Sequence, residues 1–252
     1  MKYLSISAYS YDSLLKSSGV KLELITCPQL YEFYERAIRG GLAVVCGRFE
    51  KCNNLSIPDH DPNLPFKIVE VDDINGCYAW ALSQPLPTSV SFCSSDQENW
   101  LRDEIIDNRL ANVDVTDDIS YTCDVSIYYD PKFIPYLANY PPIPVKRTID
   151  PSLLSNHTLD LLNRSGKAVD KSPRLLADLE SKRITLHSYF LKSLMEMGVE
   201  VTELHRASYA VQSSWVKDYV DENTRRRSLA KDDFLKSFYK LKVRKLNFER
   251  NF

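Results

Sequence analysis

The stretch Val69-Glu70-Val71-Asp72-Asp73-Ile74-Asn75-Gly76-Cys77-Tyr78-Ala79-Trp80-Ala81-Leu82 decides how this chain is interpreted. An apolar run leads into Asp73, and Tyr78 follows five residues later. A carboxylate at the end of a rigid strand is suited to Mg²⁺, because this cation prefers oxygen ligands. A turn after the strand would then bring the aromatic ring under the sugar of a nucleotide. The stretch therefore predicts a metal-dependent site for phosphoryl transfer.

Taken alone, this pattern also has a structural interpretation, since acidic residues often follow strands and favour turns. Other blocks of the chain agree with the functional interpretation. They are Tyr11-Asp12-Ser13-Leu14-Leu15, residues 19–26, Ile38-Arg39-Gly40-Gly41, Arg48-Phe49 with Lys51 and Asn53-Asn54, Leu204-His205-Arg206, Ser213 to Lys217, Asn223-Thr224 and Ala230 to Phe234.

In this order and spacing, the blocks resemble the family B DNA polymerases, which write motif A as Asp-x-x-Ser-Leu-Tyr-Pro. Trp80 and residues 83–87 are similar to the protein-primed branch of viruses, organellar plasmids and Polinton-type transposons. The resemblance runs from about Tyr11 to Lys240. It implies DNA replication by template-directed deoxynucleotidyl transfer, and a fragment that extends from the exonuclease-polymerase joint to the start of motif B.

The resemblance also implies roles for the residues around the nucleotide. Asp73 would be the motif A ligand of Mg²⁺, and Tyr78 would pack against the sugar and exclude a 2′-hydroxyl. Asn75 and Gly76 would shape the turn whose backbone NH groups approach the phosphates. Lys240 would be the catalytic lysine of motif B.

Further roles concern a second phosphate cation and the DNA. Lys236, one helical turn before the motif B lysine, would also contact the phosphates. Arg39, Gly40 and Gly41 resemble the Tyr-x-Gly-Gly element and would contact the backbone of the template-primer. A terminal-protein primer is a further expected partner. For Gly40 and Gly41, the alternative is that they only end a helix.

The chain departs from the family after residues 238–241. Relatives continue with the Asn-Ser-x-Tyr-Gly half of motif B, whereas this chain reads Lys242-Val243-Arg244-Lys245-Leu246-Asn247-Phe248-Glu249 and has no Asp-Thr-Asp of motif C. Because a two-metal centre needs more than one carboxylate, we expect the chain to be inactive alone. One alternative is a non-catalytic DNA- or protein-binding remnant of a mobile element or virus. Another is a helical interaction module.

Composition constrains function less. The 252 residues include 32 basic and 34 acidic side chains, so the net charge of −2 gives no support for nucleic-acid binding. Local basic patches occur at residues 171–174 and at Arg225-Arg226-Arg227. The six cysteines form no Cys-x-x-Cys pair, and buried reduced thiols are expected. No apolar run approaches a membrane span, so we expect a soluble, intracellular protein.

The expected fold is α+β, a partial palm with a small antiparallel sheet and a helical fingers segment. Four regions are predicted: a joint at 1–41, a palm with an insertion at 42–150, a connector at 151–173 and fingers at 174–252. Apolar periodicity predicts helices at 28–38, 186–197 and 222–241, the last with Ala230, Phe234, Phe238 and Leu241 on its buried face. Strands are predicted at 42–46, 66–71 and 121–128.

Overall fold

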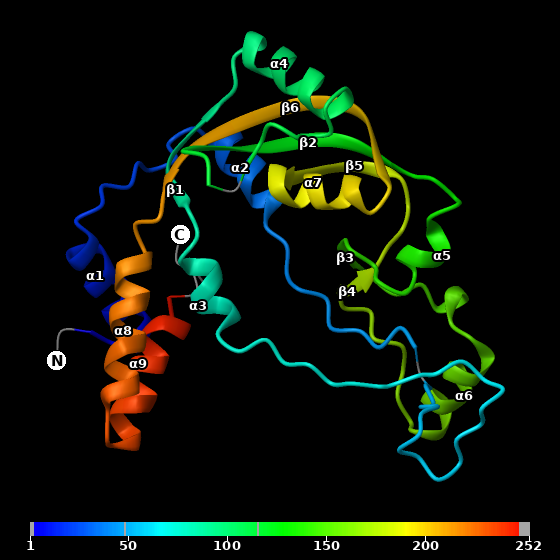
Figure 1. Cartoon of the computed structure of the whole chain (residues 1–252). Coiled ribbons are helices and arrows are strands. Elements are labelled where there is room, and N and C mark those ends of the chain that lie inside the picture. Colours follow the sequence, from blue (N-terminus) through cyan, green and yellow to red (C-terminus); the bar gives the residue numbers. More distant parts are fainter. Residues whose placement is uncertain (1–2, 48, 115, 247–252) are drawn as a thin grey trace.

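The computed structural model describes residues 3–47, 49–114 and 116–246 (Figure 1). Arg48 and residues 247–249, both quoted above, lie outside this part of the chain. The expected α+β class is confirmed. The helices are α1 Ile6–Ser18, α2 Pro28–Ala37, α3 Cys77–Leu82, α4 Ser95–Ile106, α5 Ile134–Leu137, α6 Asn156–Arg164, α7 Ser188–Glu196, α8 Lys217–Leu229 and α9 Asp233–Arg244, with a 3₁₀ turn at Pro151–Leu153.

A four-stranded antiparallel sheet forms the centre of the molecule. Its strands are β1 Leu86–Phe92, β6 Val199–Ser213, β2 Ile119–Tyr129 and β5 Lys182–His187, in this spatial order. Two short strands, β3 Pro144–Arg147 and β4 Arg174–Ala177, pair separately. The prediction at 121–128 is confirmed, because this segment is the core of β2.

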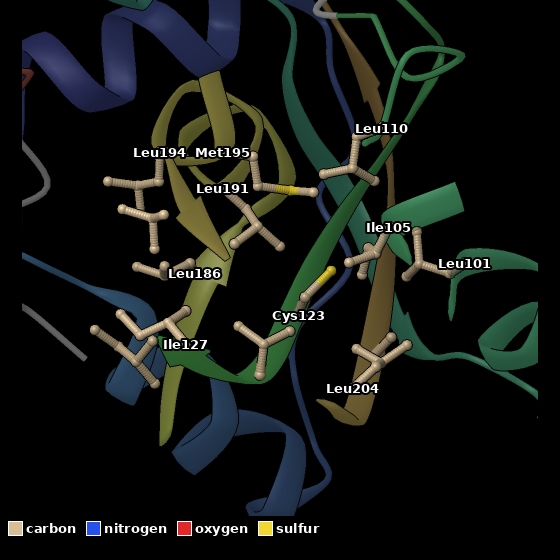
Figure 2. Close-up of a cluster of buried hydrophobic side chains, with 14 of the residues drawn as sticks. Leu101, Ile105, Leu110, Cys123, Ile127, Leu186, Leu191, Leu194, Met195 and Leu204 are labelled. Carbon is tan, nitrogen blue, oxygen red and sulfur yellow. The ribbon is translucent and has the colours of Figure 1, made fainter. Parts of the chain in front are cut away.

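The main hydrophobic core lies between this sheet and helices α4 and α7. Cys123 and Ile127 of β2 pack with Leu101 of α4 and with Leu191 and Leu194 of α7 (Figure 2). Burying such side chains stabilises each by about 1.5–3 kcal/mol relative to exposure. This core fixes β2 and β5, the strands beside which Arg39 lies.

A second, smaller core joins α1, α8 and α9 away from the sheet (Figure 1). Leu14, Tyr219, Val220 and Val243 are buried in it, and α3 packs against α8 and α9. The predicted helix at 222–241 is instead two helices. The chain turns between them, where the Asp232 side chain accepts a hydrogen bond from the backbone NH of Phe234 at 2.7 Å and caps α9.

The predicted buried face of this helix is partly wrong. Phe234 is 73% exposed, whereas Val243 and Lys242 are buried. The break near Ala230 changes the rotation of α9 relative to α8, so one continuous helical period does not describe both helices. Lys242 is accommodated because its ammonium lies over the rings of Tyr9 and Tyr219, 5.4 and 5.1 Å from their centroids.

The strands predicted at 42–46 and 66–71 are wrong. Both segments are extended but largely exposed, with Val45 75% and Val71 96% exposed, and only Lys67 forms an isolated bridge, with Asn53. A strand needs neighbours that satisfy its backbone, and the four strands of the sheet come from elsewhere in the chain. Asp73 therefore lies in a loop that leads to α3 and has no sheet beneath it.

Other predictions need smaller corrections. The helix at 28–38 is confirmed as α2, and that at 186–197 is confirmed as α7. The connector at 151–173 contains α6, which its polar composition concealed. Of the cysteines, only Cys93 and Cys123 are buried, so the expectation of buried thiols fails for the remaining ones: Cys27, Cys46, Cys52 and Cys77.

Candidate nucleotide and nucleic-acid sites

A pocket of about 590 Å³ lies between the loop before α3, α3 itself and the helical pair α8 and α9. We call it the α3–α9 pocket. It brings together five of the residues singled out in the sequence: Asp73, Asn75, Gly76, Tyr78 and Lys240. These residues come from segments far apart in the chain, and the cavity that they line is large enough for a small ligand.

The loop side of the pocket is shaped by Gly76. This residue has φ 74° and caps α3, and its carbonyl accepts a hydrogen bond from the NH of Trp80 at 2.9 Å. Glycine adopts this left-handed conformation without the steric cost that a Cβ would impose. Tyr78 lies in the first turn of α3, and it is 62% exposed. The ring is therefore accessible to a ligand.

The helical side of the pocket is cationic. Arg227 of α8 and Lys240 and Arg244 of α9 line it, against the single carboxylate of Asp73. None of these side chains forms an ion pair with another described residue. Three cations with one carboxylate favour an anionic ligand, and guanidinium and ammonium groups are suited to phosphate.

Arg227 and Arg244 are site residues that the sequence interpretation missed. The run Arg225-Arg226-Arg227 was recognisable as a basic patch, but its members differ. Glu222 holds Arg225 at 2.8 Å and Arg226 at 2.6 Å, and these guanidinium groups lower the pKa of Glu222 to about 2. Of these three arginines, only Arg227 lines the pocket. Consecutive side chains leave a helix in different directions, and this direction is what separates Arg227 from its two neighbours.

Lys236 does not line the α3–α9 pocket. Its ammonium is 3.0 Å from the Asp233 carboxylate on the same helix. The predicted role of Lys236 as a second phosphate cation stays a prediction that would require this exposed pair to separate.

The pocket does not fit a two-metal centre. Asp73 is its only carboxylate, and the part of the chain that the structure describes contains no group of three His, Cys, Asp or Glu side chains able to hold a metal ion. Magnesium in phosphoryl-transfer sites is usually held by carboxylates together with substrate phosphates. The residues that line the pocket supply at most one such ligand.

The predicted DNA-contacting residues lie apart from this pocket, after α2. Arg39 donates from Nη2 to the backbone oxygens of Thr185 and Arg36, at 3.2 and 3.3 Å. Burial lowers the pKa of Arg39 from its ordinary value, yet a guanidinium remains charged at neutral pH. A Cβ at Gly40 would meet Leu175 at an ordinary 3.6 Å, and one at Gly41 would meet nothing. Packing within the chain therefore does not require glycine at either position.

Two histidines, one of them in the block Leu204-His205-Arg206, have structural surroundings. The His187 side chain caps α7 by accepting a hydrogen bond from the NH of Tyr189, and burial lowers the pKa of this imidazole to about 4. His205 Nε2 lies 2.7 Å from the hydroxyl of Ser126 on the neighbouring strand. Neither lines the α3–α9 pocket.

The fold is similar to that of part of a DNA polymerase. A solved structure of Phi29 DNA polymerase, in an orthorhombic crystal form, matches 97% of this chain and 36% of that chain, with a TM-score of 0.52 and 15% sequence identity. Its ternary complex with primer-template DNA and incoming nucleotide matches with a TM-score of 0.48 and 14% identity. The chain thus spans about a third of that polymerase. The expected resemblance is confirmed at the level of the fold.

No model of a known protein family matches the sequence, and no curated protein matches it. Within the described residues, no helix is both long and apolar enough to cross a membrane.

Proposed function

We propose that this chain is the palm-and-fingers portion of a protein-primed family B DNA polymerase, and that the α3–α9 pocket binds the triphosphate of an incoming deoxynucleotide. The observation that carries the proposal is the shared location of Asp73, Asn75, Gly76, Tyr78 and Lys240. The resemblance assigns Asp73 to the metal, Lys240 to catalysis and the remaining three to the nucleotide, and all five line one cationic cavity.

The chemistry of the pocket supports an anionic nucleotide. Lys240, Arg227 and Arg244 would neutralise phosphates, because charge-assisted hydrogen bonds to phosphate are stronger than neutral ones. The exposed ring of Tyr78 would contact the sugar from α3. Asp73 would be a ligand of a Mg²⁺ ion that also binds the phosphates. The family's Mg²⁺ would supply charge neutralisation, but one carboxylate cannot assemble the catalytic pair.

DNA would be contacted elsewhere, at Arg39 and the adjacent Gly40 and Gly41. Because the fold is similar to part of Phi29 DNA polymerase, primer-template DNA is the ligand to test at these residues. A terminal-protein primer is proposed as a partner of the insertion expected within the palm region 42–150.

The test is a calorimetric titration of the chain with dTTP and, in parallel, with thymidine. We expect dTTP to bind and thymidine to bind at least ten times more weakly, because the cations recognise phosphate. Equal affinity for both, or no binding of dTTP, would overturn the assignment of the pocket.

A second candidate is a non-catalytic DNA- or protein-binding remnant. The presence of only one carboxylate in the pocket favours it. This candidate predicts DNA binding that is unaffected by dTTP, whereas the polymerase fragment should bind primer-template more tightly when the matching nucleotide is present.

A further inference from the structure

A second cavity, of about 380 Å³, lies between the end of α2 and strand β5. We call it the α2–β5 pocket. Four cationic side chains line it, Arg36, Arg39, Lys182 and Arg183, against the single carboxylate of Asp124. This excess of positive charge is local, because the whole chain carries a net charge of −2. Carboxylates of the chain already pair with two of these cations.

Asp124 compensates Arg183. The carboxylate lies on the central strand β2, and its side chain is only 5% exposed. Arg183 Nη2 donates to it at 2.7 Å, and Nε lies 3.1 and 3.2 Å from its two oxygens. This two-point contact satisfies the buried carboxylate and fixes the guanidinium plane. Since 58% of the Arg183 side chain stays exposed, its remaining donors can reach a ligand.

Lys182 is compensated from outside the pocket. Its ammonium lies 2.6 Å from Asp178, a carboxylate that also holds Arg147 at 2.8 Å. Arg147 in turn reaches Glu180 at 2.7 Å. Two cations and two carboxylates thus form a chain of ion pairs beside the pocket.

Arg36 and Arg39 remain uncompensated. In the regions that the structure describes, neither forms an ion pair. Arg39 is bonded only to backbone oxygens, and its buried Nε has no hydrogen-bond partner. A half-buried guanidinium without an anion is unfavourable, and a buried donor left unpaired adds to this cost. An anionic ligand in the pocket would relieve both.

We propose that the α2–β5 pocket binds a phosphate group, with Arg36 and Arg39 as its uncompensated ligands and Arg183 oriented toward it by Asp124. The fork geometry of guanidinium matches phosphate oxygens, and Asp124 sets the plane of one such fork in advance. The phosphate is assigned to a nucleic-acid backbone. That assignment, but not the site, rests on the proposed function. No residue of the α3–α9 pocket takes part.

The test uses the full chain with Lys240→Ala, which weakens the nucleotide pocket, and compares it with the same chain carrying Arg36→Ala. Arg36 is the most informative position, because its removal leaves no buried carboxylate unpaired. Binding of a fluorescein-labelled duplex oligonucleotide is measured at several salt concentrations. Arg36→Ala should weaken it about tenfold regardless of sequence, and should reduce the slope of log affinity against log salt by about 0.9.

Arg102→Ala is the matched control, because this arginine lies on α4 and lines neither pocket. It should bind as the parent does. Arg183→Lys retains a positive charge opposite Asp124 but loses the two-point contact, so a partial loss of affinity is expected. Binding of dTTP to chains with native Lys240 should be unaffected by Arg36→Ala, which separates this site from the nucleotide pocket.

Inorganic phosphate provides the second arm. If phosphate competes with the oligonucleotide and Arg36→Ala weakens both, the proposal holds. If phosphate binds but the oligonucleotide does not, the phosphate site stands and its assignment to nucleic acid is overturned. If neither ligand is affected by Arg36→Ala or Arg183→Lys, the pocket is only an internal charge cluster and the proposal fails.

Discussion

Asp73 and Lys240 line one pocket, although the first precedes α3 and the second lies on α9. Neither forms an ion pair with a described residue, so both charges remain free to interact with a ligand. Packing of α3 against α8 and α9 produces this arrangement. A carboxylate and an ammonium that face one cavity without pairing are suited to a ligand that carries both a metal and phosphates.

Lys240→Ala should weaken dTTP binding at least tenfold, because a hydrogen bond to a charged group contributes about 1.5–3 kcal/mol. Lys236→Ala is the matched control on the same helix. The Lys236 ammonium pairs with Asp233 and lies outside the pocket. The affinity of the Lys236→Ala variant for dTTP should therefore change less than twofold. Calorimetric titration measures both. Equal losses for the two variants would mean that general charge, not the pocket, attracts the nucleotide.

The purified chain should not extend a primer in the presence of Mg²⁺ and deoxynucleotides. Loss of one essential electrostatic group commonly costs about 3–4 kcal/mol of transition-state stabilisation. Here the pocket has a single carboxylate. A gel-based extension assay with labelled primer checks this, with Asp73→Ala as the reference. Extension that disappears in Asp73→Ala would show that the chain assembles a working centre.

Five residues named from the motifs line one pocket, whereas apolar periodicity did not identify the elements around it correctly. The relation between Asp73 and Tyr78 depends on a short local turn around Gly76, which the sequence determines directly. The strand expected at 66–71 depends on partners, and a run rich in Val and Ile cannot indicate whether a neighbouring strand exists. Val71 is therefore exposed although its sequence is typical of a buried strand.

The long strand β6 was missed for a related reason. Residues 199–213 contain Glu200, Glu203, His205 and Arg206, so they do not alternate cleanly between apolar and polar side chains. The strand is nevertheless central, because it pairs with β1 on one side and β2 on the other. Bulges opposite β2 shift the register twice, and each shift interrupts the twofold side-chain period that a strand would show.

Gly198→Ala should destabilise the fold by about 2–4 kcal/mol. Gly198 has φ 94°, and a Cβ there would lie 2.6 Å from the ring of Phe133, so backbone strain and overpacking add. Gly41→Ala is the control, because its φ is not positive and a Cβ meets no atom within 4 Å. Urea denaturation should show a lower midpoint for the first variant only. A similar loss in both would contradict this local explanation.

Stability should also decrease as the pH falls from about 6.5 toward 4. Burial lowers the pKa of His187 to about 4, whereas an unfolded histidine titrates near 6.5. Between these values the unfolded chain binds more protons than the folded chain, so the free energy of unfolding rises with pH. The contribution of this group is complete above pH 6.5 and lost below pH 4. Its size is about 2 kcal/mol between pH 7 and pH 5.

His187→Asn isolates the effect of this histidine from that of other titrating groups. Asn is one of the residues preferred at the N-cap, so the cap of α7 on the Tyr189 NH is retained while the titration is removed. Urea denaturation at pH 7, 6 and 5 should show a decline in the wild type that is at least halved in the variant. Parallel declines in the two proteins would mean that the imidazole is already solvated in the folded chain and that α7 does not bury it.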